Sequence, residues 1–145
     1  MILQPDTSAL IKLYVEEAHS DAVKAGTEGA EAVASSAVAH AEARATLGRL
    51  RRENRLSDAG LTEAKTSFER DWPAFLRVQT DEALLRRAGD LAELLALRGY
   101  DGVHLAAAEL ARTRSDTPVI FACFDNALNR APRALGFDLL PMNGT

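Results

Sequence analysis

Four acidic residues in this sequence have the types and positions that a metal-dependent reaction needs: Asp6, Glu42, Asp101 and Asp125. Carboxylates that converge repel one another and raise one another's pKa values, so such a cluster needs a counter-charge. Mg²⁺ or Mn²⁺ meets this need because both ions prefer oxygen ligands. An ion held in this way can activate water and orient a phosphate, so the four acids predict hydrolysis of a phosphodiester.

Each acid also has a local interpretation that the sequence leaves open. Asp6, Asp101 and Asp125 can each cap a helix or close a turn, and Glu42 can be a solvated helix residue. His104 lies three residues after Asp101, so we expect it to pack beside the site in a structural role. The chain has no dinucleotide-binding glycine fingerprint, no P-loop and no nucleophile elbow, which argues against those three classes.

Short apolar runs alternate with longer helical patterns, and these elements must position the acids. The apolar runs predict strands at residues 2–5, 32–35, 76–79, 119–124 and 137–140. The helical patterns predict helices at residues 9–15, 36–52, 57–72, 81–99, 101–114 and 126–134, and a short one within 16–30. Ser36 is expected to cap the second long pattern, and Gly99 to end the Leu-rich one.

Strands separated by helices predict right-handed crossovers, and therefore a parallel sheet with helices on both faces. Ligands of such sheets bind beyond the carboxyl ends of the strands. Asp6 and Asp125 each follow a strand directly, so both should reach that edge. Asp101 opens a helix after a turn, and Glu42, placed about two turns into its helix, can lean back toward the same edge. Four acids from separate segments are therefore expected to converge.

Length and composition set the remaining bounds. The 145 residues predict a single domain over residues 1–145. The net charge of −4 by itself argues against a nucleic-acid partner, but five arginines between Arg44 and Arg55 can form one basic face. The single cysteine, Cys123, allows no internal disulfide, which fits the cytoplasm. We expect no signal peptide and no membrane association, because no long apolar run is present.

Four blocks of the sequence resemble the PIN-domain proteins, and especially the VapC toxins of bacterial toxin–antitoxin pairs. The first block runs from Asp6 to Tyr14, and the second is Ser36 followed by Glu42. The third is Tyr100–Ala108, and the last begins at Phe124–Leu128 and continues through residues 134–137. The blocks span nearly the whole chain in the family's order, which makes the resemblance fairly specific.

The resemblance implies a three-layer α/β/α sandwich on a central, mainly parallel sheet of four to five strands. It implies that Asp6, Glu42, Asp101 and Asp125 bind Mg²⁺ or Mn²⁺, and that the protein is an endoribonuclease acting on a tRNA or an rRNA loop. It further implies a cognate VapB-type antitoxin, and a homodimer or a heterotetramer with that antitoxin.

Within this picture we predict particular roles for the residues around the acids. Asp6 and Asp101 are the expected primary ligands, and Glu42 and Asp125 complete the cluster, partly through waters. Ser8 and Ser36 are expected to position acids or water, or else to act only as N-caps. Arg44 and Arg49, which follow Glu42, are expected to guide the RNA backbone.

The sequence departs from the family at Cys123, where many relatives carry Thr or Ser two positions before the last Asp. A thiol is a poorer hydrogen-bond partner for bound water, which weakens the expected support of Asp125. Two rival functions remain open on the same residues: a metal-dependent DNA nuclease, and a catalytically silent module that binds RNA or protein. A receiver-like signalling domain ranks lower, because no Lys follows residue 66.

Overall fold

A computed structural model describes residues 1–141, in which five parallel strands form one sheet. The strands are β1 (Ile2–Pro5), β2 (Ala32–Ser36), β3 (Leu76–Val78), β4 (Val119–Ala122) and β5 (Asp138–Leu139). Their order across the sheet is β3-β2-β1-β4-β5, and each neighbouring pair is parallel. The predicted parallel sheet is therefore confirmed, with β1 at its centre.

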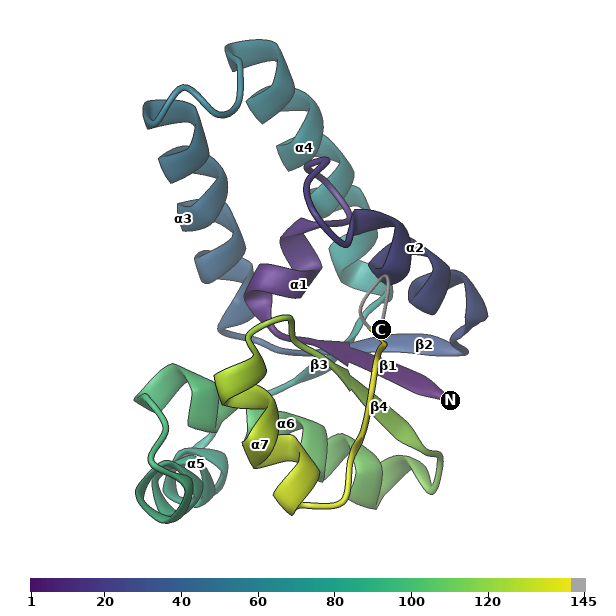
Figure 1. Cartoon of the computed structure of the whole chain (residues 1–145), viewed down its shortest axis with the longest axis vertical. Coiled ribbons are helices and arrows are strands. Elements are labelled where there is room, and N and C mark those ends of the chain that lie inside the picture. Colours follow the sequence, from purple (N-terminus) through teal and green to yellow (C-terminus); the bar gives the residue numbers. More distant parts are fainter. Residues whose placement is uncertain (142–145) are drawn as a thin grey trace.

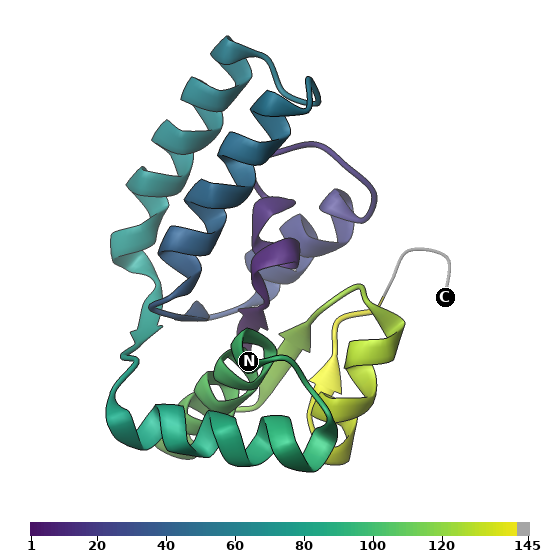
Figure 2. The same cartoon turned by 90° about the vertical axis from the view of Figure 1, so that its left-hand side faces the viewer.

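Helices cover both faces of the sheet and make the predicted three-layer sandwich (Figure 1). The helices are α1 (Thr7–Ile11), α2 (Ser20–Gly29), α3 (Ala39–Arg52), α4 (Asp58–Asp71), α5 (Glu82–Leu95), α6 (Gly99–Ser115) and α7 (Asn126–Ala134), with a 3₁₀ turn at Trp72–Ala74. The first four lie on one face and the last three on the other, and α3 and α4 form a hairpin that extends away from the sheet (Figure 2). None of the helices within residues 1–141 combines the length and apolar character that crossing a membrane requires.

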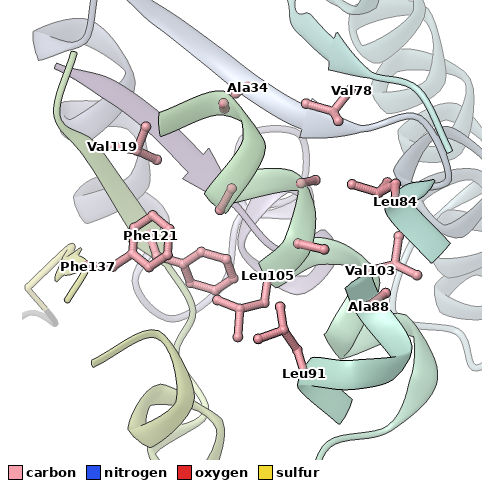
Figure 3. Packing of buried hydrophobic residues seen from close by; sticks show 14 of the residues in the cluster. Ala34, Val78, Leu84, Ala88, Leu91, Val103, Leu105, Val119, Phe121 and Phe137 are labelled. Carbon is pink, nitrogen blue, oxygen red and sulfur yellow. The ribbon is translucent and has the colours of Figure 1, made fainter. Parts of the chain in front are cut away.

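The face covered by α5, α6 and α7 holds the larger core cluster (Figure 3). Val119 and Phe121 point from the sheet toward α6, where Leu105 is buried beside them, and Ile2 belongs to the same cluster. Helices α5 and α6 approach so closely that a Cβ built on Gly102 would lie 2.5 Å from the carbonyl oxygen of Ala88. A glycine is required there because any side chain would meet backbone. This contact fixes the N-terminal turn of α6 against α5.

The opposite face holds a second cluster between α1, α3 and α4. Leu10, Leu47 and Phe68 are fully buried in it, and each contributes about 1.5–3 kcal/mol by leaving water. Leu3 of β1 and Val23 of α2 form a neighbouring cluster on the same side of the sheet. Because Ile2 and Leu3 point to opposite faces, β1 is buried on both sides, as expected for a central parallel strand.

Helix boundaries differ from the sequence predictions at three places. The first helix ends at Ile11 rather than Val15, because Leu13 and Tyr14 bond three residues back in a tighter turn. The long helix predicted from Ser36 begins at Ala39, because Ser36 remains in β2, paired with Val78 of β3. Glu42 consequently lies in the first turn of α3, not two turns into it.

The end of α5 is the third difference. The sequence predicted Gly99 as the residue that ends this helix, but Ala96 takes the left-handed conformation there, with φ of 54°. Gly99 instead becomes the first residue of α6. A left-handed Ala costs about 1 kcal/mol, which the packing of α5 on α6 outweighs. This connection is short, and it brings Asp101 into the first turn of α6.

Candidate metal centre at the carboxyl end of the sheet

One cavity of about 350 Å³ at the carboxyl end of the sheet is lined by all four predicted acids. Asp6 comes from the end of β1, Asp125 from the end of β4, Glu42 from α3 and Asp101 from α6. The other lining residues are Thr7, Ser8, Arg98, His104 and Leu128. The structure thus brings the four acids together, while their role as metal ligands stays a prediction.

Asp6 both caps a helix and lines the cavity. Its Oδ1 accepts hydrogen bonds from the backbone N–H of Ala9 at 2.9 Å and from the Ser8 hydroxyl at 2.8 Å. These bonds leave Oδ2 outside the cap. The two interpretations of Asp6 are therefore compatible, and Ser8 donates a hydrogen bond to this carboxylate.

Glu42 is the acid with the most elaborate hydrogen bonding. Its Oε1 accepts from the Thr7 hydroxyl at 2.8 Å and lies 2.7 Å from Nε2 of His104. Burial by itself raises the pKa of Glu42, but the hydrogen bonds from His104 and Thr7 and the charge of His104 outweigh burial, so its pKa lies below the ordinary value. Glu42 is accordingly an ionised ligand candidate at neutral pH.

Asp101 lies in the first turn of α6, where the helix dipole stabilises a negative charge. Its Oδ2 is 3.3 Å from Nε of Arg98, three residues earlier. The Asp101 side chain is 20% exposed and that of Arg98 is 87% exposed, so the guanidinium is free to swing away from the acid. Arg98 also lines the cavity, and among residues 1–141 it is the one guanidinium there.

Asp125 caps α7, since its Oδ1 accepts from the backbone N–H of Ala127 at 2.9 Å and of Leu128 at 3.4 Å. Cys123, two residues earlier, is buried, and its Sγ lies 3.9 Å from the backbone oxygen of Asp125. Burial, followed by the charge of Asp6, raises the pKa of the Cys123 thiol far above its ordinary value. The thiol therefore stays neutral and contacts the Asp125 backbone rather than its carboxylate.

Three residues with predicted roles at the site do not line the cavity. Ser36 is buried because strand β2 extends through it. Its hydroxyl accepts a hydrogen bond from the Val38 N–H at 3.3 Å. Arg44 pairs with Glu69 of α4 at 2.9 Å, and Arg49 faces Glu53 at 3.7 Å. Arg44 and Arg49 do not line the cavity. Their role in guiding RNA stays a prediction, and it would place the RNA along the hairpin of α3 and α4.

The cavity contains two functional candidates that the sequence did not single out. These are Thr7 and Arg98, which both line it. His104 was expected beside the site in a structural role, yet it bonds directly to Glu42. A signal for Arg98 was present, because a cation three residues before an acid at a helix start can fold back onto it.

The donor set fits a hard divalent cation in chemical type. Four carboxylates with one guanidinium give the cavity excess negative charge, and all four acids supply oxygen ligands. Within residues 1–141, however, no three His, Cys, Asp or Glu side chains stand close enough to form a ready ligand group. Each acid is instead held by its cap, by Arg98 or by His104 and Thr7.

Comparisons with known proteins find relatives both in sequence and in structure. The model of the PIN domain matches residues 4–134. Two curated relatives from Mycobacterium tuberculosis, ribonuclease VapC45 of strain CDC 1551 and ribonuclease VapC49 of strain H37Rv, are each 34% identical over 136 residues, covering 94% of this chain and 92% of the relative. The crystal structure of FitAcB from Neisseria gonorrhoeae shares the fold at a TM-score of 0.65 and 20% identity, covering 97% of both chains.

Proposed function

This chain belongs to the PIN-domain family, and from that premise we propose that it is a Mg²⁺- or Mn²⁺-dependent endoribonuclease of the VapC type. The observation that carries the proposal is the cavity lined by Asp6, Glu42, Asp101 and Asp125 at the carboxyl end of the parallel sheet. The two relatives named as VapC ribonucleases support RNA as the substrate.

The four acids would hold the cation, with Asp6 and Asp101 as the primary ligands and Glu42 and Asp125 completing the set. A divalent ion bound there supplies the Lewis acidity that phosphodiester hydrolysis requires. Asp6 is fixed by its helix cap, and Glu42 by two hydrogen bonds, so both carboxylates are oriented before a substrate arrives.

Arg98 is the residue in this cavity best suited to bind the phosphate. Its guanidinium is exposed and only loosely held by Asp101, with 3.3 Å between Nε and Oδ2. An RNA phosphate can compete for it and pull it toward the substrate. A second cavity of about 660 Å³ shares Glu42, Arg98 and Asp101 with the first, which gives nucleotides on one side of the scissile bond room to lie.

The biological setting follows from the same family membership. We propose that a VapB-type antitoxin silences the enzyme, that the chain forms a homodimer or a heterotetramer with that antitoxin, and that a tRNA or an rRNA is cleaved in the cytoplasm. The names of the two VapC relatives support the antitoxin partner.

The direct test is cleavage of RNA by the purified protein with Mg²⁺ or Mn²⁺, beside single-stranded DNA and beside samples with EDTA. Asp6→Asn and Asp101→Asn should each lower RNA cleavage by about 100-fold or more. Asn caps helices as well as Asp does, so Asp6→Asn keeps α1 intact. Asp116→Asn is the matched control, because Asp116 is exposed at the far end of α6.

Four outcomes distinguish the alternatives. RNA cleavage that needs a divalent ion and both acids supports the proposal. Cleavage of DNA alone would assign a DNA nuclease, and no cleavage of either polymer, together with no Mn²⁺ binding, would assign a silent binding module. Variants of Asp6 and Asp101 as active as wild type would refute the metal site.

A further inference from the structure

We infer that His104 and Thr7 are positioning residues that set the orientation of the Glu42 carboxylate for metal binding, an inference that rests on the proposed function. Both side chains meet the same oxygen: the Thr7 hydroxyl donates to Oε1 of Glu42 at 2.8 Å, and Nε2 of His104 lies 2.7 Å from it. Thr7 Oγ1 and His104 Nε2 are themselves 3.3 Å apart, so the three polar groups form a closed triangle.

The triangle joins three elements that are distant in the chain. Thr7 is the first residue of α1, Glu42 lies in the first turn of α3, and His104 lies in α6. The three pairs are separated by 35, 62 and 97 residues. Two donors at fixed angles on one oxygen leave a carboxylate little freedom to rotate. The Oε2 atom, which takes no part in the triangle, is then the atom held ready for a cation.

The chemistry of His104 argues against a role in packing alone. Its side chain is 4% exposed, and its Nδ1 is buried with no hydrogen-bond partner among the described residues. Burying a polar ring costs free energy that an apolar ring of similar size would not cost. The polar contacts of the ring are thus confined to Nε2, which faces Glu42 and Thr7. Because an ionised carboxylate can only accept, Nε2 must carry the proton.

The direction of the effect follows from this geometry. Removing either donor frees the Glu42 carboxylate to rotate, so metal binding must then fix it at the expense of entropy. Groups that hold a ligand in this way are typically worth about 10- to 100-fold in metal affinity. A conservative replacement that keeps a donor near Oε1 should retain most of that affinity. A residue that only fills space would show neither the loss nor the rescue.

The decisive measurement is the Mn²⁺ affinity of the purified whole chain by isothermal titration calorimetry. Thr7→Val keeps the shape of Thr7 without its hydroxyl, and His104→Leu removes the ring nitrogen; each should weaken Mn²⁺ binding by about 10-fold or more. Thr7→Ser and His104→Gln retain a donor and should stay within about 3-fold of wild type. Thr113→Val, which removes a hydroxyl bonded within α6, is the matched control and should leave the affinity unchanged.

A second set of variants separates positioning from general loss of structure. In a Glu42→Gln background, Thr7→Val and His104→Leu should cause no further loss of Mn²⁺ affinity, because the group that they hold has been removed. A loss that persists in that background would mean that the whole cavity has been disturbed, and would overturn the inference. Unfolding in urea identifies any variant that is not folded. If Thr7→Val or His104→Leu is unfolded, the Mn²⁺ affinities of Thr7→Ser and His104→Gln are compared with wild type instead.

A measurement without metal tests the hydrogen bonds themselves. Nitrogen-15 correlation spectra of the imidazole rings should show a proton on Nε2 of His104, with a shift that changes in Glu42→Gln and in Thr7→Val. A proton on Nδ1 alone would overturn the inference. Mn²⁺ affinity that Thr7→Val and His104→Leu both leave unchanged would overturn it while the proposed function stands, whereas a wild-type chain that binds no Mn²⁺ would end both.

Discussion

The contact between α5 and α6 gives a prediction whose size can be worked out from the structure. A Cβ at position 102 would lie 2.5 Å from the Ala88 carbonyl oxygen and 3.3 Å from the Cβ of Ala92. An ordinary carbon–oxygen contact is about 3.3–3.6 Å, so Gly102→Ala forces the two helices apart by most of an ångström. The obstructing atom belongs to the backbone and cannot rotate away.

The free energy of this change is a balance of two terms. Overpacking of this kind costs about 1–3 kcal/mol, and contact with rigid backbone favours the upper end. Alanine gains up to about 1 kcal/mol over glycine in a helix, which leaves a net loss of about 2 kcal/mol in the free energy of unfolding. Gly89→Ala in α5 is the matched control, because its Cβ would meet nothing within 4 Å. It should gain about 1 kcal/mol.

Urea unfolding followed by far-ultraviolet circular dichroism measures both variants under the same conditions. The two should differ by about 3 kcal/mol in unfolding free energy, with Gly102→Ala below wild type and Gly89→Ala above it. A Gly102→Ala protein as stable as wild type would refute the close approach of α5 and α6. Equal gains in both variants would mean that helix propensity, and not the contact with Ala88, decides the outcome.

Two further predictions concern stability. Phe68→Ala should lower the free energy of unfolding in urea by about 3–5 kcal/mol, because Phe68 is fully buried. Leu94→Ala is the control: this side chain is 74% exposed, so the change should be less than about 0.5 kcal/mol. Similar losses in the two variants would contradict the assigned core. The second prediction concerns Glu109, whose pKa is lowered by hydrogen bonds from Arg87 at 2.6 and 2.8 Å. Because the pKa is lowered, this pair stabilises the fold fully above the unfolded pKa of about 4.3. That contribution is lost as the pH falls through the lowered pKa of the folded state. Glu109→Gln should thus be less stable than wild type at pH 7 by up to about 1 kcal/mol, and the difference should close as the pH falls through that lowered pKa. A difference independent of pH would show that the charge is not involved.

Several elements could be predicted because local patterns were enough to specify them. The apolar run ending before Asp125 and the helical pattern of residues 57–72 placed β4 and α4 close to their observed bounds. The acids at strand ends were predicted to meet because parallel strands share one carboxyl edge, and Asp6 and Asp125 do line one cavity there.

The errors arose where a distant partner outweighed local preference. Ser36 has the composition of a helix cap, yet pairing with Val78 of β3 keeps it in a strand. Ala96 has no intrinsic tendency toward the left-handed conformation, yet the packing of α6 on α5 places the turn there instead of at Gly99. Arg44 pairs with Glu69 of the neighbouring helix, a contact that local sequence did not indicate, and its role in guiding RNA stays a prediction.

The sequence by itself determined the four acids, the parallel sheet that presents them and the family to which the chain belongs. Only the tertiary structure decided how each acid is held: Asp101 by Arg98, and Glu42 by His104 and Thr7, whose positions are 97 residues apart. The physical reason is the range of the interactions. Caps, strand ends and helix periods depend on neighbouring residues, whereas a hydrogen-bonded triangle exists only after α1, α3 and α6 have packed together.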